Sequence, residues 1–197
     1  MSIQRIFIHG APYSGVDEIA EDLAGKIEAE FIHFAKILKE HIVTLDRKIA
    51  QRQGTLVRCG VSIHDDFVGP VVQGNIRDMV LGNQPFVVSG YPRLPSQVGM
   101  LEGCDDLLDQ KALFIAIGGL RTGEIFKRAG RVHCPTRRDL KAIDRADDFN
   151  KIIGSVVSAF GSHPNWTAVR LNIKPDWSQE QVLENVCELA CVPSSVS

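Results

Sequence analysis

The clearest chemical signal in the sequence is a glycine loop near its start. Gly10 and Gly15 stand five residues apart, after an apolar stretch at 6–8 and before an amphipathic stretch at 17–28. A strand, a loop with this glycine spacing and a helix form the layout that binds phosphate groups through backbone N–H groups. Val16 stands where that motif has its lysine. The sequence therefore predicts a phosphate-binding scaffold without its main cation.

Two carboxylates follow the loop directly. Asp17 and Glu18 fall in the first turn of the expected helix, whose partial positive charge favours anions. An incoming triphosphate would meet both carboxylates with no lysine to offset them. One pair of unit like charges at about 4 Å costs on the order of 1–4 kcal/mol between water and a protein surface. The pair argues against tight triphosphate binding, although Glu18 is a candidate ligand for magnesium.

The elements that must position this loop alternate along the chain. We expect strands at 6–9, 31–33, 86–89, 112–117 and 167–172, and helices at 17–28, 35–49, 65–80, 123–129, 139–160 and 178–190, with a polar, irregular stretch at 51–62. Ser178 and Gln181 form a capping box at the start of the last helix. Strands that are apolar on both faces are typical of a parallel sheet covered on both sides. Sites in such folds lie beyond the carboxyl ends of the strands.

Three segments resemble the adenylate kinase family of nucleoside monophosphate kinases. The loop at 10–18 is similar to the family's G-x-P-G-S-G-K-G-T, and 31–42 to the segment that carries T-G-D-L-L-R. Residues 86–97, FVVSGYPRLPSQ, are similar to an apolar strand followed by D-G-[FY]-P-R-x-x-x-Q, the most specific match. The resemblance implies a P-loop NTPase-like α/β fold, three layers α/β/α around a parallel five-stranded sheet, with adenylate-kinase topology. It implies one domain at 1–192, with a nucleoside-monophosphate-binding subdomain at 34–82, a short lid at 128–141 and a flexible tail at 193–197.

The resemblance also implies roles for individual residues where this sequence matches the family. Arg93 and Gln97 match the pair that holds the nucleoside monophosphate, and Lys39 stands at the position of the family's other phosphate-binding arginine. The nucleotide-binding candidates are Gly10, Ser14, Gly15, Lys39, Arg93 and Gln97. Arginines of the lid neutralise charge on the phosphoryl oxygens during transfer. If the protein is active, the matching catalytic candidates are Arg128, Arg131, Arg138 and Arg145.

The side that would hold ATP departs from the family pattern. Val16 replaces the lysine, Glu18 the threonine and Ser89 the aspartate that helps to hold magnesium. Phe34 also replaces a threonine on the monophosphate side. No resident cofactor or metal is expected on this basis. Mg-ATP and AMP are the candidate ligands, and Glu18 is the one candidate for magnesium.

Three functions stay open from these residues. The favoured one is a catalytically inactive pseudokinase that serves as a structural or interaction module of a larger assembly, such as a ciliary axoneme, with or without residual nucleotide binding. The second is a nucleotide sensor, and the third is an active ATP:AMP phosphotransferase with an atypical loop. Negligible disproportionation of ADP is the corresponding expectation.

Composition excludes several other classes of protein. The 197 residues are 44% hydrophobic and 23% charged, with a net charge of −2, which does not suit a general nucleic-acid binder. No apolar run approaches the about 20 residues of a membrane span. The start of the chain has no signal or transit pattern, and the five cysteines are scattered. We expect a cytoplasmic protein with free thiols, without nucleic acid or membrane insertion and with protein partners.

Overall fold

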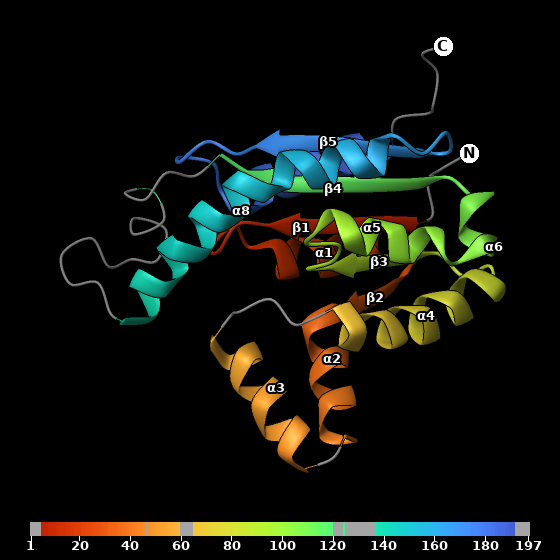
Figure 1. Cartoon of the computed structure of the whole chain (residues 1–197). Helices are drawn as coiled ribbons and strands as arrows, with labels where there is room; N and C mark the ends of the chain where they lie inside the picture. The colour runs from red at the N-terminus through yellow and green to blue at the C-terminus, as the bar shows by residue number, and fades with distance from the viewer. Residues whose placement is uncertain (1–4, 46, 60–64, 120–123, 125–136, 192–197) are drawn as a thin grey trace.

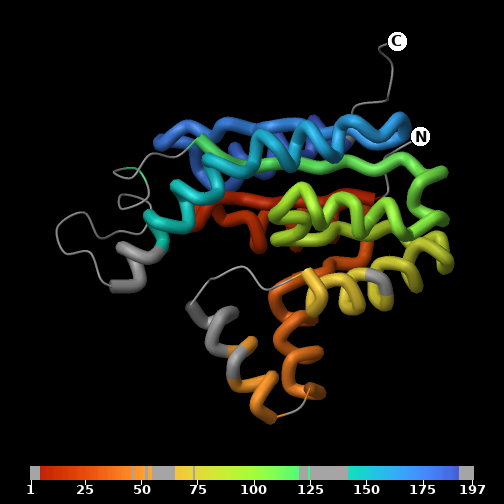
Figure 2. The backbone as a smooth tube through the Cα atoms, viewed as in Figure 1, coloured from red at the N-terminus to blue at the C-terminus, as the bar shows by residue number. Residues whose placement is uncertain are grey.

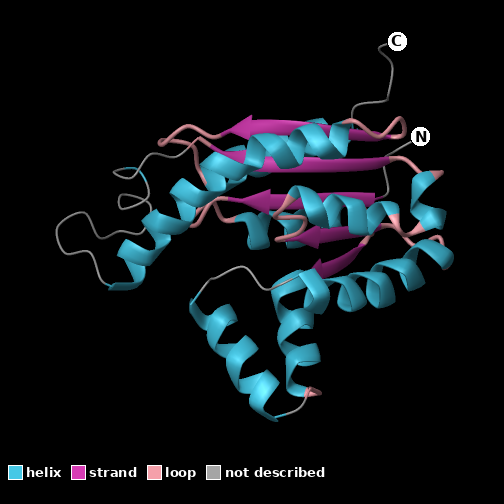
Figure 3. Cartoon of the chain, in the orientation of Figure 1, coloured by secondary structure: helices cyan, strands magenta, loops and turns pink. Residues whose placement is uncertain are grey.

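The computed structural model describes residues 5–45, 47–59, 65–119, 124 and 137–191 (Figures 1 and 2). Its centre is a sheet of five strands in the order β2-β3-β1-β4-β5. The strands are β1 Arg5–Gly10, β2 Glu30–His33, β3 Phe86–Ser89, β4 Ala112–Gly118 and β5 Trp166–Asn172. Every neighbouring pair is parallel, which confirms the predicted sheet (Figure 3).

Two apolar cores lie on the two faces of this sheet. Alternate residues of β1 point to opposite faces, so Ile6 and Ile8 join one core and Phe7 the other. The first core packs against α1 Val16–Lys26 and α9 Gln179–Cys191. The second packs against α4 Asp65–Leu81, α5 Pro95–Glu102 and α8 Arg137–Gly161. The predicted α/β/α layering is therefore confirmed.

The helix predicted over 35–49 is wrong in its extent. The chain forms α2 Phe34–Val43 and then α3 Arg47–Cys59, so the predicted irregular stretch at 51–62 is largely helical as well. The Thr44 hydroxyl donates to the His41 carbonyl at 2.7 Å, and the Leu45 amide donates to Ile42 at 3.2 Å. These i→i−3 bonds replace the i→i−4 pattern and end α2.

The remaining predicted elements either agree more closely with the structure or lie outside the described residues. The capping box at α9 is confirmed, because the Ser178 hydroxyl accepts from the Gln181 amide at 3.2 Å and the Gln181 side chain accepts from the Ser178 amide at 2.9 Å. α6 Asp105–Leu108 is a short addition. The predicted helix at 123–129 lies outside the described residues except for Glu124, as do 128–136 of the predicted lid and the tail. The subdomain at 34–82 stays a prediction. It contains α2 and α3, which Figure 1 shows beyond the β2 edge of the sheet.

Within the described part of the chain, no helix is both long enough and apolar enough to cross a bilayer.

Candidate functional site

A cleft of about 1060 Å³ opens where β1, β2 and β3 reach their carboxyl ends. The loop at 10–18 forms one wall, His33 and Ser89 stand at the ends of their strands, and α8 contributes another wall. This is the position at which sites of parallel sheets form.

The geometry of the loop depends on its two glycines. A Cβ on Gly10 would lie 2.4 Å from the Ser14 hydroxyl and 2.9 Å from the Val16 Cβ, so any other residue would force the loop to shift. Gly15 has a φ of 74°, a left-handed conformation that glycine adopts at little cost, and α1 begins directly after it. Tyr13, where the family resemblance expects glycine, is also left-handed with a φ of 62°. The loop therefore keeps the sharp turn of a phosphate loop while carrying a bulky side chain.

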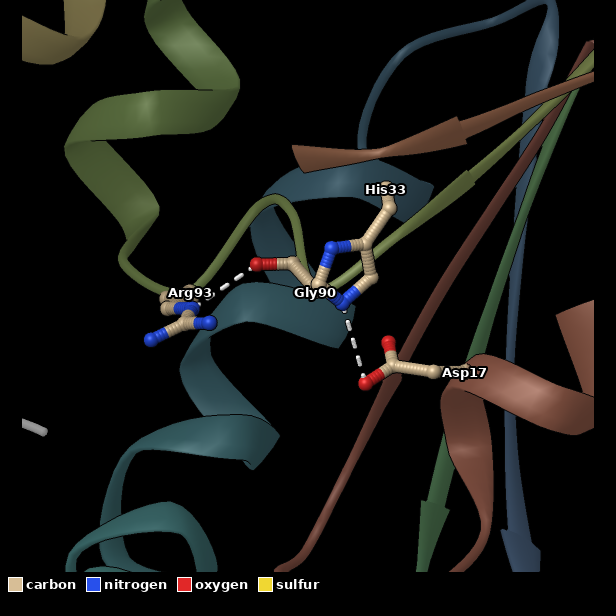
Figure 4. A network of polar contacts seen from close by, with 4 residues as sticks. All are labelled: Asp17, His33, Gly90 and Arg93. Atoms are coloured by element: carbon tan, nitrogen blue, oxygen red, sulfur yellow. Dashed lines mark hydrogen bonds and ion pairs between the residues drawn. The ribbon is translucent and has the colours of Figure 1, made fainter. Parts of the chain in front are cut away.

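Asp17 lies in the first turn of α1 and lines the cleft. Its carboxylate lies 3.1 Å from Nε2 of His33, and Figure 4 shows the two side chains facing each other. This contact with His33 is the main cause of a lowered pKa for Asp17; partial burial opposes it, while the nearby Ser89 hydroxyl and the charge of Arg93 add to it. Asp17 is therefore held as a carboxylate inside the cleft.

Arg93 is fixed on the opposite side of the same space. Its Nε donates to the Gly90 carbonyl at 2.8 Å (Figure 4), and its backbone amide donates to Oε1 of Gln97 at 2.8 Å. Burial lowers the pKa of Arg93, the Asp17 carboxylate raises it and the guanidinium of Arg145 lowers it further. The cleft thus holds two arginines, Arg93 and Arg145, and Arg93 is the one that acts on the carboxylate of Asp17.

Gln97 and Lys39 do not line this cleft. Gln97 is only 3% exposed, and its amide nitrogen donates to Asp65 at 3.3 Å, so both ends of the side chain bind the chain itself. Phe34 stacks on Tyr91 with ring centroids 4.6 Å apart, and both rings are buried. The structure therefore brings Gly10, Ser14, Gly15 and Arg93 to the cleft. Gln97 supports Arg93 from behind through its backbone amide, and Lys39 does not line the cleft.

Arg145 is the one lid candidate that the structure places at the cleft. Arg128 and Arg131 lie outside the described residues, and Arg138 is described in its backbone alone, as part of α8. Their assignment as catalytic residues stays a prediction.

His9, the last residue but one of β1, lines the cleft. Its ring meets Phe149 edge-on at 5.2 Å. Burial, helped by the charge of Arg93 and opposed by Asp17, lowers the pKa of His9 to about 3. Its Nδ1 and the hydroxyls of Ser14 and Ser89 are buried without a regular hydrogen-bond partner among the described residues. Three such polar atoms around one cleft suit a polar ligand or water.

The lowered pKa of His9 predicts a loss of stability on acidification. The unfolded chain takes up a proton below about pH 6.5 while the folded chain keeps this ring neutral. The effect of His9 on the free energy of unfolding is therefore negligible well above pH 6.5 and becomes increasingly destabilising toward pH 3. Between pH 7 and pH 5 we expect it to cost about 1–2 kcal/mol of unfolding free energy.

Urea unfolding of the wild type and of His9→Phe at both pH values measures this contribution. His9→Phe keeps an aromatic ring against Phe149 and should lose less stability on acidification by that amount. His41→Gln is the matched control, because His41 lies in α2 away from the cleft. Equal pH dependence in the wild type and His9→Phe would contradict the assignment.

Comparison with known proteins agrees with this geometry. No protein-family model matches the chain. The chain is 26% identical over 118 residues to the adenylate kinase of Mycoplasma mobile, a match that covers 58% of this chain and 51% of that protein. The match therefore spans about half of the relative's length. It supports the resemblance to the adenylate kinase family that the loop and residues 86–97 indicate.

Proposed function

We propose that this protein is an adenylate-kinase-like pseudokinase, whose cleft binds a phosphate-bearing ligand without transferring a phosphoryl group. The observation that carries the proposal is the position of Asp17, which contacts His33 and lines the same cleft as the glycine loop. Phosphoryl transfer depends on positive charge at the transferred group. Here the loop presents the carboxylates of Asp17 and Glu18 and the apolar Val16 instead.

The residues of the loop fit a magnesium–triphosphate complex poorly. Glu18 lines the cleft and is the remaining candidate to hold the metal. Among the described residues no group of three or more His, Cys, Asp or Glu side chains gathers at one point. Magnesium is usually held by one or two carboxylates together with substrate phosphates. With the triphosphate itself repelled, Glu18 alone is too small a donor set.

Residual binding of a phosphate-bearing ligand is supported on the other side of the cleft. Arg93 is fixed by Gly90 and its guanidinium faces the space that Arg145 also lines. Guanidinium groups are the preferred partners of phosphate in proteins. AMP, which carries one phosphate, is thus better suited to this cleft than Mg-ATP.

A role as an interaction module of a larger cytoplasmic assembly, cytoskeletal or ciliary, completes the proposal. Large apolar side chains are exposed at Val43, Ile49 and Leu81, on three different helices, and are candidate contact points for such a partner. Phosphotransferase activity is the alternative. It would require another cation at the loop, and Lys36, in the first turn of α2, is exposed and does not line the cleft.

Thermal unfolding with AMP, Mg-ATP and a two-headed adenosine polyphosphate tests the proposal. A ligand present at 100 times its dissociation constant adds about 2.7 kcal/mol, a shift of several degrees in Tm. We expect a smaller, reproducible rise with millimolar AMP, none with Mg-ATP, and no rise for Arg93→Met with AMP. A clear rise with Mg-ATP would contradict the pseudokinase assignment. If none of the ligands raises the Tm, the role as an interaction module is the only part of the proposal that remains.

A further inference from the structure

We propose that the Asp17 carboxylate is a built-in occupant of an anion site formed by His33, Ser89 and Arg93, which accepts an external phosphate group once that carboxylate is removed. The proposal rests on the assignment of the cleft to a phosphate-bearing ligand. It adds the residue that keeps the affinity of the cleft for this ligand low.

The donors around Asp17 come from three separate elements. His33 ends β2 and contacts the carboxylate at 3.1 Å, Ser89 ends β3, and Arg93 follows β3 after the turn at Gly90. Figure 4 shows His33, Asp17 and Arg93 around one space. An imidazole, a hydroxyl and a guanidinium that line one cleft are together suited to binding an anion.

Two buried hydroxyls at this site are unsatisfied. Ser14 and Ser89 are each 1% exposed, both line the cleft, and neither hydroxyl has a regular hydrogen-bond partner among the described residues. The Ser89 hydroxyl lies near Asp17 and contributes to the lowered pKa of that carboxyl. A phosphate has more acceptor oxygens than a carboxylate and offers partners for both hydroxyls.

Among the charged residues around the site, Asp17 is the one expected to control the binding of an external anion. Glu18 shares its helical turn, and Asp144, Arg145 and Asp148 line the cleft from α8. The described contact of His33 is with Asp17, and both Asp17 and Arg145 act on Arg93. Neutralising Asp17 removes the negative charge that faces His33 and acts on Arg93, whereas neutralising Glu18 removes a charge with no described contact to these groups.

Calorimetric titration of the full chain tests the site, with inorganic phosphate and AMP as separate probes. We expect Asp17→Asn to bind inorganic phosphate at least about tenfold more tightly than the wild type, which corresponds to about 1.4 kcal/mol. Glu18→Gln is the matched control for charge and Asp22→Asn, farther along α1, the control for the helix. Glu18→Gln should gain clearly less than Asp17→Asn, and Asp22→Asn should change the affinity less than about threefold.

Each outcome decides the proposal. A higher affinity of Asp17→Asn for both phosphate and AMP supports a site for the phosphate group itself. The proposal would be overturned if Asp17→Asn gained affinity for AMP alone or bound both probes as the wild type does. An equal gain in affinity for Glu18→Gln would overturn it as well. Asp17→Ala repeats the test if Asp17→Asn unfolds, as its thermal transition would show. Failure of the proposed function is a separate observation, because it appears as turnover or Mg-ATP binding by the unmutated protein.

Discussion

The combined variant Val16→Lys, Asp17→Gly, Glu18→Thr is expected to bind ATP at least about a hundredfold more tightly than the wild type. It restores at 16–18 the residues of the adenylate kinase loop that the sequence resembles. Two negative charges leave the mouth of the loop and one positive charge enters it. Each unit charge at about 4 Å from a phosphate is worth on the order of 1–4 kcal/mol, so three changes favour binding by about 3 kcal/mol or more. Calorimetric titration with ATP measures the gain.

Val16→Lys alone is the informative comparison for this variant. The new ammonium lies next to the carboxylates of Asp17 and Glu18 and is largely neutralised by them. We expect a smaller gain in ATP affinity and no phosphoryl transfer, since Glu18 and Ser89 remain. Measurable turnover by Val16→Lys, with none in the wild type, would mean that the missing lysine alone disables the loop, contrary to the role proposed for Asp17.

Phe160→Ala is expected to destabilise the protein by about 3–5 kcal/mol, the usual cost of deleting a buried phenylalanine. Phe160 is fully buried in α8, and its ring meets Phe7 at 5.7 Å, Phe114 at 5.5 Å and Trp166 at 4.8 Å. It thus joins α8 to the strands β1, β4 and β5. A domain of this kind has about 5–15 kcal/mol of stability in total, so the variant should be only marginally folded at 25 °C.

Urea unfolding followed by circular dichroism measures this loss. Leu81→Ala is the control, because Leu81 is 59% exposed and its truncation should cost no more than about 0.5 kcal/mol. A Phe160→Ala variant as stable as Leu81→Ala would show that α8 does not pack on the sheet as described.

Much of the fold could be predicted because its strands carry a local signal. The apolar run at 112–117 and the glycine loop after 6–9 are patterns within a few residues, and β4 and β1 form there. Helix ends were less predictable. The apolar positions Leu38, Ile42, Leu45 and Ile49 keep helical spacing across a break that hydrogen bonds of Thr44 and Leu45 decide. α5 was missed because Pro95–Glu102 has little amphipathic pattern of its own.

The glycine loop of the site could be predicted from the sequence, whereas the contacts between its side chains could not. The acidic first turn of α1 predicts repulsion of a triphosphate, which needs the sequence of that turn alone. The partner of Asp17 is His33, and these two meet only because β2 ends beside the start of α1. In the sequence, histidines at the ends of two expected strands, His9 and His33, were the available signal. Likewise, nothing local to Gln97 indicates that Arg93 and Asp65 bind its side chain.

The most direct test of the central claim is phosphorus NMR of the unmutated protein with ADP and magnesium, which follows the formation of ATP and AMP. If Asp17 and Glu18 disable the loop as proposed, both products should form at the rate of a protein-free sample. The same result should hold at several magnesium concentrations, since Glu18 alone is too small a donor set for the metal. Turnover above that background, abolished by Arg93→Met, would contradict the claim and establish an active phosphotransferase with an unusual loop.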